Sequence, residues 1–195
     1  ENRRAPRRLS FPPFFSFVTF VRVMPDPLPP EAAAAPPSAR LGKFIRVAAL
    51  GGPRPSWKAW DMGAGRWVAL KRIDGAGPDE ISRLTREATN AAKLTHPYIA
   101  AIYEAGEVDG VPFVSTQFVD GLSLRSLARG DGVRLVRLIR DASRAVAYAH
   151  AQGHVHRDLT PENLMVRQQA KDLHLFVTDF GLARTVTGVV VGTPA

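Results

Sequence analysis

Two short stretches decide how this chain folds. Residues 156–163 read His-Arg-Asp-Leu-Thr-Pro-Glu-Asn, and residues 179–181 read Asp-Phe-Gly. Two apolar runs, 164–166 and 173–178, lie between them and are separated by a polar connection, which predicts a β-hairpin. Antiparallel pairing sets the first residue of one strand beside the last residue of the other. The Asn that precedes the hairpin and the Asp that follows it should therefore meet.

Carboxylate and amide oxygens at the mouth of a hairpin suit Mg²⁺, which takes few protein ligands and shares its shell with phosphate. We therefore take Asn163 and Asp179 as candidate metal ligands. Asp158 precedes Asn163 in the same loop, and a carboxylate there can orient or deprotonate an attacking hydroxyl. An acidic loop beside a hairpin can also be an ordinary solvated turn, but the eight-residue run upstream argues against that interpretation.

Residues 67–73 alternate as a strand does, which places Ala69 and Lys71 on one face. A lysine between apolar neighbours on a strand usually has an anionic partner, and Glu87 is our candidate. Glu87 lies at the edge of the apolar stripe of a helix predicted to begin near Pro78. We therefore expect a Lys71–Glu87 ion pair. The alternative is a surface lysine and a surface glutamate that never meet.

The 195 residues, of which 45% are hydrophobic, are enough for one domain or part of a larger one. The absence of cysteine excludes disulfides and thiolate metal sites and suits a reducing compartment, so we expect a cytoplasmic location. The formal net charge of +8 invites a nucleic-acid partner. We predict none, because a regular group of arginines lines the outer face of an amphipathic helix expected at 132–152: Arg134, Arg137, Arg140 and Arg144. The complementary stripe, which includes Leu135, Leu138 and Ile139, should face the core.

Residues 1–40 are expected to form a disordered leader rich in proline and alanine. Its apolar run, 11–23, contains two prolines and is too short to cross a bilayer as a helix, so we predict no membrane span within this chain. Because the sequence begins with Glu1, we take Met24 as a candidate for the true start.

The order of these motifs resembles that of the protein kinase superfamily, and within it the bacterial serine/threonine kinases, over residues 41–195. The resemblance implies an α+β, two-lobe fold. Residues 41–118 would form an antiparallel β small lobe with a C helix, and 119–195 the start of a mainly helical large lobe, as far as the activation segment. ATP and Mg²⁺ are the implied cofactors, and the implied partner is a protein with a Ser or Thr hydroxyl.

The resemblance also implies a role for each matching residue. Lys71 would bind the nucleotide phosphates with Glu87 as its partner on the C helix, and Asp158 and Arg157 would belong to the catalytic loop. Asn163 and Asp179 would hold magnesium. The residues expected to bind ATP are Gly51, Gly52, Ala69, Lys71, Thr116 as gatekeeper, Gln117 and Val119.

The sequence departs from the family pattern in three places. The glycine-rich loop is short and contains Pro53 and Pro55, which lack amide donors, so we expect weak nucleotide binding. Thr160 stands where the family carries a lysine, which predicts slow turnover. The sequence ends before the family's A-P-E motif, so we expect a C-terminally truncated domain whose activity is crippled, with the isolated 195 residues inactive or nearly so. The alternatives are a pseudokinase-like module that binds nucleotide or a partner without turnover, and a non-functional gene fragment.

Overall fold

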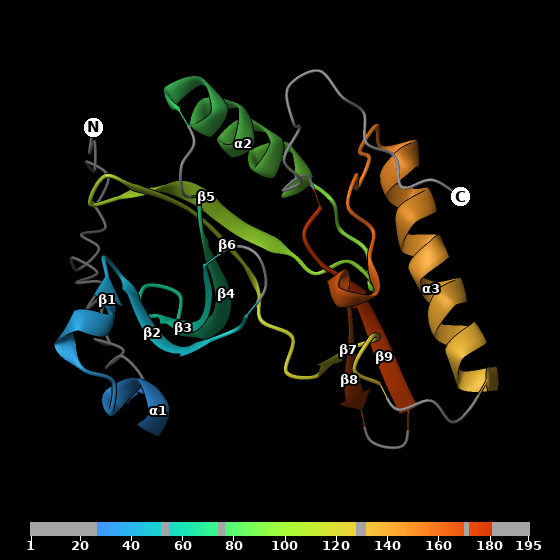
Figure 1. Cartoon of the computed structure of the whole chain (residues 1–195), viewed down its shortest axis with the longest axis horizontal. Helices are drawn as coiled ribbons and strands as arrows, with labels where there is room; N and C mark the ends of the chain where they lie inside the picture. The colour runs from blue at the N-terminus through green and yellow to red at the C-terminus, as the bar shows by residue number, and fades with distance from the viewer. Residues whose placement is uncertain (1–26, 52–54, 74–76, 128–131, 170–171, 181–195) are drawn as a thin grey trace, which may run out of the picture.

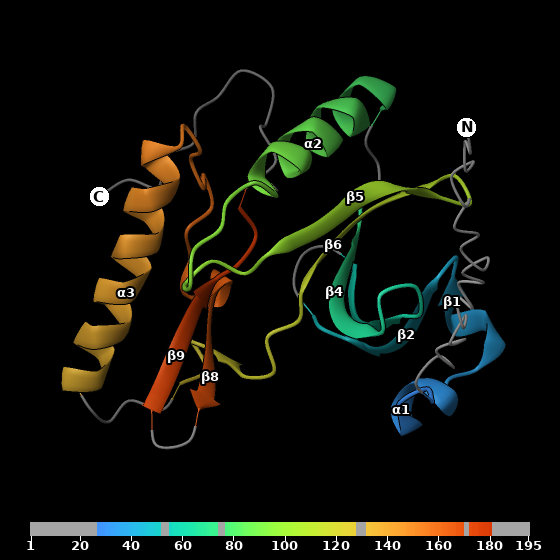
Figure 2. The ribbon, with the colours of Figure 1, turned by 180° about the vertical axis from the view of Figure 1, so that it is seen from behind.

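The computed structural model describes residues 27–51, 55–73, 77–127, 132–169 and 172–180. These residues form two lobes (Figure 1): a curled sheet with helix α2 above it, and a small sheet packed against helix α3. Seen from behind in Figure 2, one strand-free segment runs from β6 in the first lobe to the second, and the turn after α2 reaches the region of β9. Two connections therefore join the lobes.

The sheet of the first lobe is antiparallel throughout and has the order β1-β2-β3-β4-β6-β5. Its strands are β1 (Arg40–Leu41), β2 (Phe44–Ala49), β3 (Ser56–Asp61), β4 (Arg66–Arg72), β5 (Ile102–Val108) and β6 (Val111–Gln117). Val68 and Leu70 of β4 pack with Phe44 and Phe113 on one face of the sheet, as the alternation predicts. Ala69 and Lys71 are left on the opposite face, which carries the site described below.

Helix α2 (Pro78–Ala91) begins at the proline that the sequence indicates. Proline is tolerated in the first helical turn because the amide it lacks has no partner there. Leu84, Ala88 and Ala91 follow one another at spacings of four and three and are buried, and α2 packs against β5 and β6. This contact fixes the helix that carries Glu87 above the sheet.

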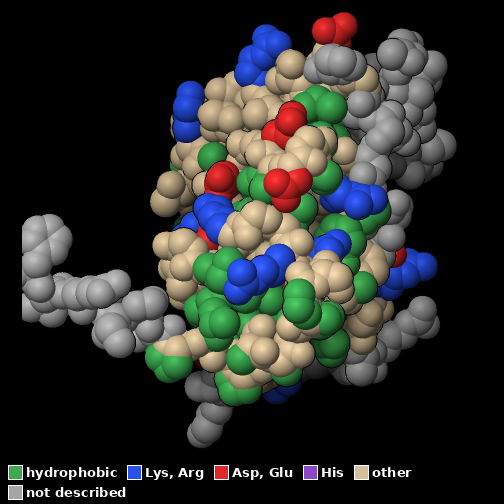
Figure 3. All heavy atoms as spheres, turned by 90° about the vertical axis from the view of Figure 1, so that its left-hand side faces the viewer, with side chains coloured by type: hydrophobic (Ala, Val, Ile, Leu, Met, Phe, Trp, Pro, Cys, Tyr) green, Lys and Arg blue, Asp and Glu red, His purple; other side chains and the backbone are tan. Residues whose placement is uncertain are grey.

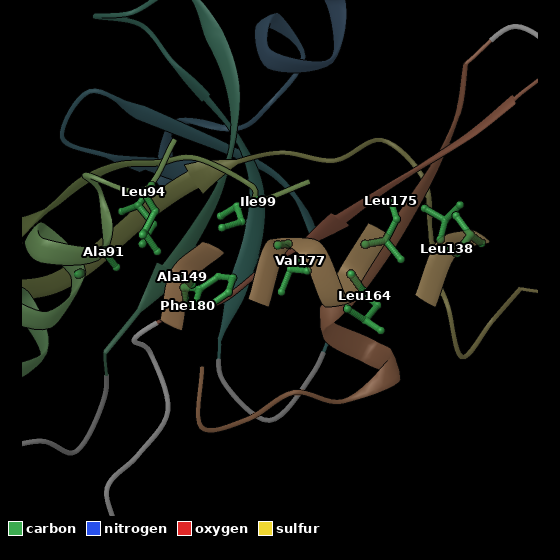
Figure 4. Close-up of a cluster of buried hydrophobic side chains, with 14 of the residues drawn as sticks. Ala91, Leu94, Ile99, Leu138, Ala149, Leu164, Leu175, Val177 and Phe180 are labelled. Carbon is green, nitrogen blue, oxygen red and sulfur yellow. The ribbon is translucent and has the colours of Figure 1, made fainter. Parts of the chain in front are cut away.

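In the second lobe, β7 (Leu122–Ser123), β8 (Leu164–Gln169) and β9 (Asp172–Val177) form a sheet in that order, and the short helix η2 (Pro161–Asn163) leads into β8. Helix α3 (Gly132–Ala151) covers β9. Figure 4 shows Leu138 and Ala149 of α3 packed with Leu164, Leu175 and Val177 of the hairpin. The predicted hairpin is confirmed. Its first strand is longer than expected because polar residues at its tip also pair, and its second strand begins and ends one residue earlier than expected.

The stripe predicted on α3 is only partly buried. Leu138 is buried, but Leu135 and Ile139 are 46% and 44% exposed. The helix touches the sheet on one narrow side, so apolar residues farther round the helix lie outside this contact. The predicted arginine face is exposed, as expected.

The expected disordered leader differs from the structure from residue 27 on. Helix α1 (Pro30–Ala33) and the 3₁₀ turn η1 (Pro37–Ala39) lie beside β2. Both begin with proline, whose fixed φ lowers the entropy lost when the segment becomes ordered. Residues 1–26, which include the candidate start Met24, lie outside the described residues.

Replacing Leu175 by alanine tests the α3–β9 core. Leu175 is 0% exposed, so we expect Leu175→Ala to lower the free energy of unfolding by about 2–5 kcal/mol. Leu122 is 56% exposed, and Leu122→Ala should change it by less than about 0.5 kcal/mol. Urea unfolding of both variants gives the comparison. Equal losses would contradict the packing described here.

Candidate functional site

His156 anchors the loop between α3 and β8. Its side chain is buried, its Nε2–H donates to the carbonyl oxygen of Thr178 at 2.7 Å, and its Nδ1 accepts from the backbone N–H of Asp158 at 3.3 Å. The edge of its ring also meets the buried ring of Phe180, with centroids 4.6 Å apart. These contacts hold the loop of Asp158 against the residues around Asp179.

The two ends of the hairpin meet, as the spacing predicts. The N–H of Thr178 donates to the carbonyl oxygen of Asn163 at 2.9 Å, and its hydroxyl donates to the same oxygen at 3.2 Å. The amide nitrogen of Asn163 donates to the backbone oxygen of Asp158 at 2.8 Å and to its carboxylate at 3.2 Å. The remaining amide atom, Oδ1, is the one able to bind a cation. Asn163 therefore joins Asp158 to the end of the hairpin.

The backbone is strained at two of these positions. Arg157 has a φ of 65° and Asp179 a φ of 69°, and among the described non-glycine residues only Asp109 shares this left-handed conformation. Such residues cost on the order of 1–3 kcal/mol and persist where their surroundings hold them, often at functional sites. Here the anchors are His156 and Phe180.

The ion pairs differ from the one expected. Lys71 pairs with Asp179, while Oε1 of Glu87 accepts from Nη1 of Arg157 at 3.3 Å. The expected partners Lys71 and Glu87 both belong to the first lobe. The fold brings a carboxylate and a guanidinium from the second lobe to the same place, and spacing along the chain cannot reveal such competitors. Glu87 Oε2 is buried without a hydrogen-bond partner in the described structure, which is unfavourable for a carboxylate oxygen.

Of the residues expected to bind ATP, Ala69 and Thr116 lie on one face of the sheet. Ala69 is paired with Thr116 across β4 and β6, and both are buried. Val119, just beyond Gln117, is buried with Met165 packed against it. Gly51 has a φ of 75° and precedes the gap at 52–54, so Gly52 lies outside the described residues.

Two residues that contact these segments were missed in the sequence. Ser56 lies opposite Lys71 in the β3–β4 pairing and donates from its hydroxyl to the carbonyl oxygen of Gly51 at 3.0 Å. Met165 packs against the segment after β6. The alternation of residues 56–61 and 164–166 is a signal that could have found both.

Close backbone packing fixes the segment that joins the lobes. A Cβ atom built on Gly121 would lie 2.2 Å from the carbonyl oxygen of Val166. Only glycine allows this approach. The segment after Gln117, which we call the hinge (residues 118–121), is therefore held against β8.

Residues 56–194 match the family model described as the protein kinase domain. The chain belongs to the protein kinase family. It is 38% identical to the serine/threonine-protein kinase PknD of Mycobacterium tuberculosis, over 77% of this chain. It is 32% identical to the probable serine/threonine-protein kinase pknA2 of Bifidobacterium longum, over 78% of this chain. The matches cover 24% and 22% of these relatives, so the chain spans about a quarter of their length.

The kinase domain of Mycobacterium tuberculosis PknI has a similar structure. The TM-score is 0.62 at 27% sequence identity, over 74% of this chain and 62% of that chain. This likeness confirms the predicted kinase-like fold. Across the described ranges, no helix is both long and apolar enough to span a bilayer. No three His, Asp or Glu side chains gather there as a metal site of their own.

The pKa of His156 gives a prediction about stability. Burial lowers its pKa below the ordinary value of 6.5, although the bond to Thr178 and the carboxylates of Asp179 and Asp158 oppose this. The unfolded chain therefore binds the proton more readily, so the free energy of unfolding should fall as pH drops from about 6.5 through the folded pKa. Urea unfolding between about pH 7.5 and 5.5 measures this loss.

His156→Phe should lose less stability over the same pH range, because it keeps a ring beside Phe180 and has no titrating group. Part of the pH dependence should remain, since burial also lowers the pKa of His96. Equal losses in the variant and the parent would show that His156 does not stay neutral in the folded protein.

Proposed function

We propose that this chain binds ATP and magnesium between its lobes and transfers the γ-phosphate to a Ser or Thr hydroxyl of a protein. The carrying observation is that one cation and three oxygen-bearing side chains converge from separate segments: Lys71, Asp158, Asn163 and Asp179. Phosphoryl transfer needs mainly positioning and charge stabilisation, which such an arrangement can supply.

The donor atoms fit magnesium. Asp179 offers a carboxylate that is mostly withdrawn from solvent. Asn163 offers a side-chain amide oxygen, and its backbone oxygen accepts a hydrogen bond from Thr178. Two hard oxygen ligands suit an ion that keeps its waters and binds phosphate. When bound, magnesium would neutralise phosphate charge. Asp179 would then release Lys71, whose ammonium group would become available for the phosphates.

Asp158 is placed to receive the acceptor hydroxyl. Its carboxylate is fixed by the amide of Asn163, and its backbone N–H is fixed by His156. A carboxylate held in this way can orient a hydroxyl or accept its proton. Arg157 and Glu87 would position the loop and α2 through their ion pair.

The other end of the nucleotide would lie against Ala69 and Thr116. The backbone groups of Gln117 and Val119 would hydrogen-bond to the adenine, with Thr116 as gatekeeper, and Gly51 and Gly52 would approach the phosphates. The lack of cysteine suits the reducing cytoplasm, where we place the protein, and we propose no nucleic-acid partner.

A second candidate is nucleotide binding without transfer. Thr160 lies in the catalytic loop between Asp158 and Asn163, where the family carries a lysine. Its hydroxyl offers a hydrogen bond without charge, so it would stabilise a γ-phosphate less in the transition state. Retention of Lys71, Asp158 and Asp179 favours the enzyme.

Asp158→Asn separates the two functions. We expect the rate of transfer from radiolabelled ATP to an acceptor protein to fall by about 10²–10⁴-fold, because the base is lost, while ATP affinity changes little. Asp172→Asn, an exposed change at the start of β9, is the matched control and should keep the parent rate. Asp179→Asn should weaken ATP binding only when magnesium is present. ATP binding without transfer in the parent would establish the second candidate.

Thr160→Lys tests the cause of slow turnover. A charged donor contributes more than a neutral one, so the transfer rate should rise by about tenfold, with a smaller change in ATP affinity. Single-turnover kinetics measure the rate apart from binding. An unchanged rate would show that the missing charge does not limit transfer.

A further inference from the structure

The residues ahead of the first long strand are bound to the small lobe at two places. In α1, the carboxylate of Glu31 pairs with the ammonium group of Lys58 on β3 at 2.5 Å, and the neighbouring Ala32 is 3% exposed. In η1, the guanidinium of Arg46 donates to the carbonyl oxygens of Ser38 at 2.8 Å and Ala39 at 3.1 Å. We call residues 28–41 the strap.

The strap covers one end of the lobe. Figure 3 faces that end, and hydrophobic side chains gather in its lower part, where Figure 1 places α1. Pro36 and Ala39 of the strap line a hollow together with Trp57 of β3, whose ring lies 5.2 Å from the guanidinium of Arg46. The second attachment is therefore both polar and apolar.

Lys58 links the first attachment to the hinge. Its ammonium nitrogen lies 4.3 Å from the ring centroid of Trp67 and 5.5 Å from that of Phe118. The side chain is only 21% exposed. Cation–π contacts become stronger as the cation is withdrawn from water. One ammonium group thus joins the carboxylate of α1 to a ring that stands between Gln117 and Val119.

The strand pairing shows on which face of the sheet Lys58 lies. Lys58 is paired with Ala69 across β3 and β4, and Ala69 is paired with Thr116 across β4 and β6. Directly opposed residues of antiparallel strands project to the same face. Lys58 therefore belongs to the face that carries the proposed adenine site and lies at its hinge side.

We propose that the strap positions the hinge through Lys58, so that releasing Glu31 from Lys58 weakens adenine binding. Lys58 is a positioning residue in this proposal, which rests on the proposed ATP site. A partly exposed ion pair alone contributes little. The convergence of a carboxylate and two aromatic rings on one cation is what makes the effect measurable, and the strap's four prolines reduce the entropy of holding it in place.

Two substitutions test the strap. Glu31→Gln removes the anion, and Lys58→Met keeps the stem but removes the cation. We expect each to weaken the binding of adenosine by about threefold to fivefold. Adenosine has no phosphate, so Lys71 and the magnesium ligands are not involved. Hydrogen exchange of the backbone amides at 117–119 should become faster in both variants, and the double variant should be no worse than Lys58→Met.

Glu104→Gln is the matched control. Glu104 forms a partly exposed ion pair in the same lobe with Lys43 at 2.6 Å, and the ammonium group of Lys43 lies over the ring of Phe44 on β2. This variant should leave both measurements unchanged. Equal effects of Glu104→Gln and Glu31→Gln would overturn the proposal, because they would reflect a general loosening of the lobe.

The remaining outcomes are also decisive. Unchanged adenosine affinity and exchange in Glu31→Gln, even with an effect of Lys58→Met, would assign the effect to Lys58 alone and overturn the strap. If the parent binds no adenosine, the proposed ATP site fails. Exchange at 117–119 then still decides the strap, since faster exchange in both variants supports it and unchanged exchange overturns it.

Discussion

The backbone pairing of Val177 with the turn after α2 joins the two lobes. Its N–H donates to the carbonyl oxygen of Tyr98 at 2.8 Å, and its carbonyl oxygen accepts from the N–H of Ala100 at 2.9 Å. Val177 is also paired with Leu164 in the hairpin and is fully buried. Asp179 follows two residues later, and the helix of Glu87 ends just before the turn. The relative placement of the Asp179 and Glu87 carboxylates depends on these two hydrogen bonds. Because Val177 is buried, water competes little for them.

Both ion pairs of the site cross from one lobe to the other. Lys71 reaches Asp179 from β4, and Arg157 reaches Glu87 from the loop between α3 and β8. Partly exposed ion pairs contribute modestly to stability. In the proposed phosphoryl transfer their importance would be chemical, because Lys71 and Asp179 already hold each other as opposite charges. An exchange of ion-pair partners would accompany magnesium binding at the proposed site, where Oε2 of Glu87 is buried without a hydrogen-bond partner in the described structure.

Local sequence patterns predicted the structure correctly where the pattern belongs to a single helix, strand or hairpin. The hairpin of β8 and β9, the start of α2 and the strand that carries Lys71 all follow from periodicity and turn residues. The leader was misjudged from residue 27 on, because proline and alanine content describes an isolated chain. Whether such a segment becomes ordered depends on the surface it meets, and here Lys58 and Arg46 bind it.

The sequence by itself determined the family and the residue types of the site, since its motifs lie in short runs whose spacing fixes which backbone groups are neighbours. The tertiary structure alone decided which charges pair and which apolar residues are covered. Lys71 meets Asp179 rather than Glu87, and Leu138 is buried while Ile139 is not. The physical reason is that electrostatic and packing energies depend on distance in space, and residues 108 positions apart can be the nearest partners.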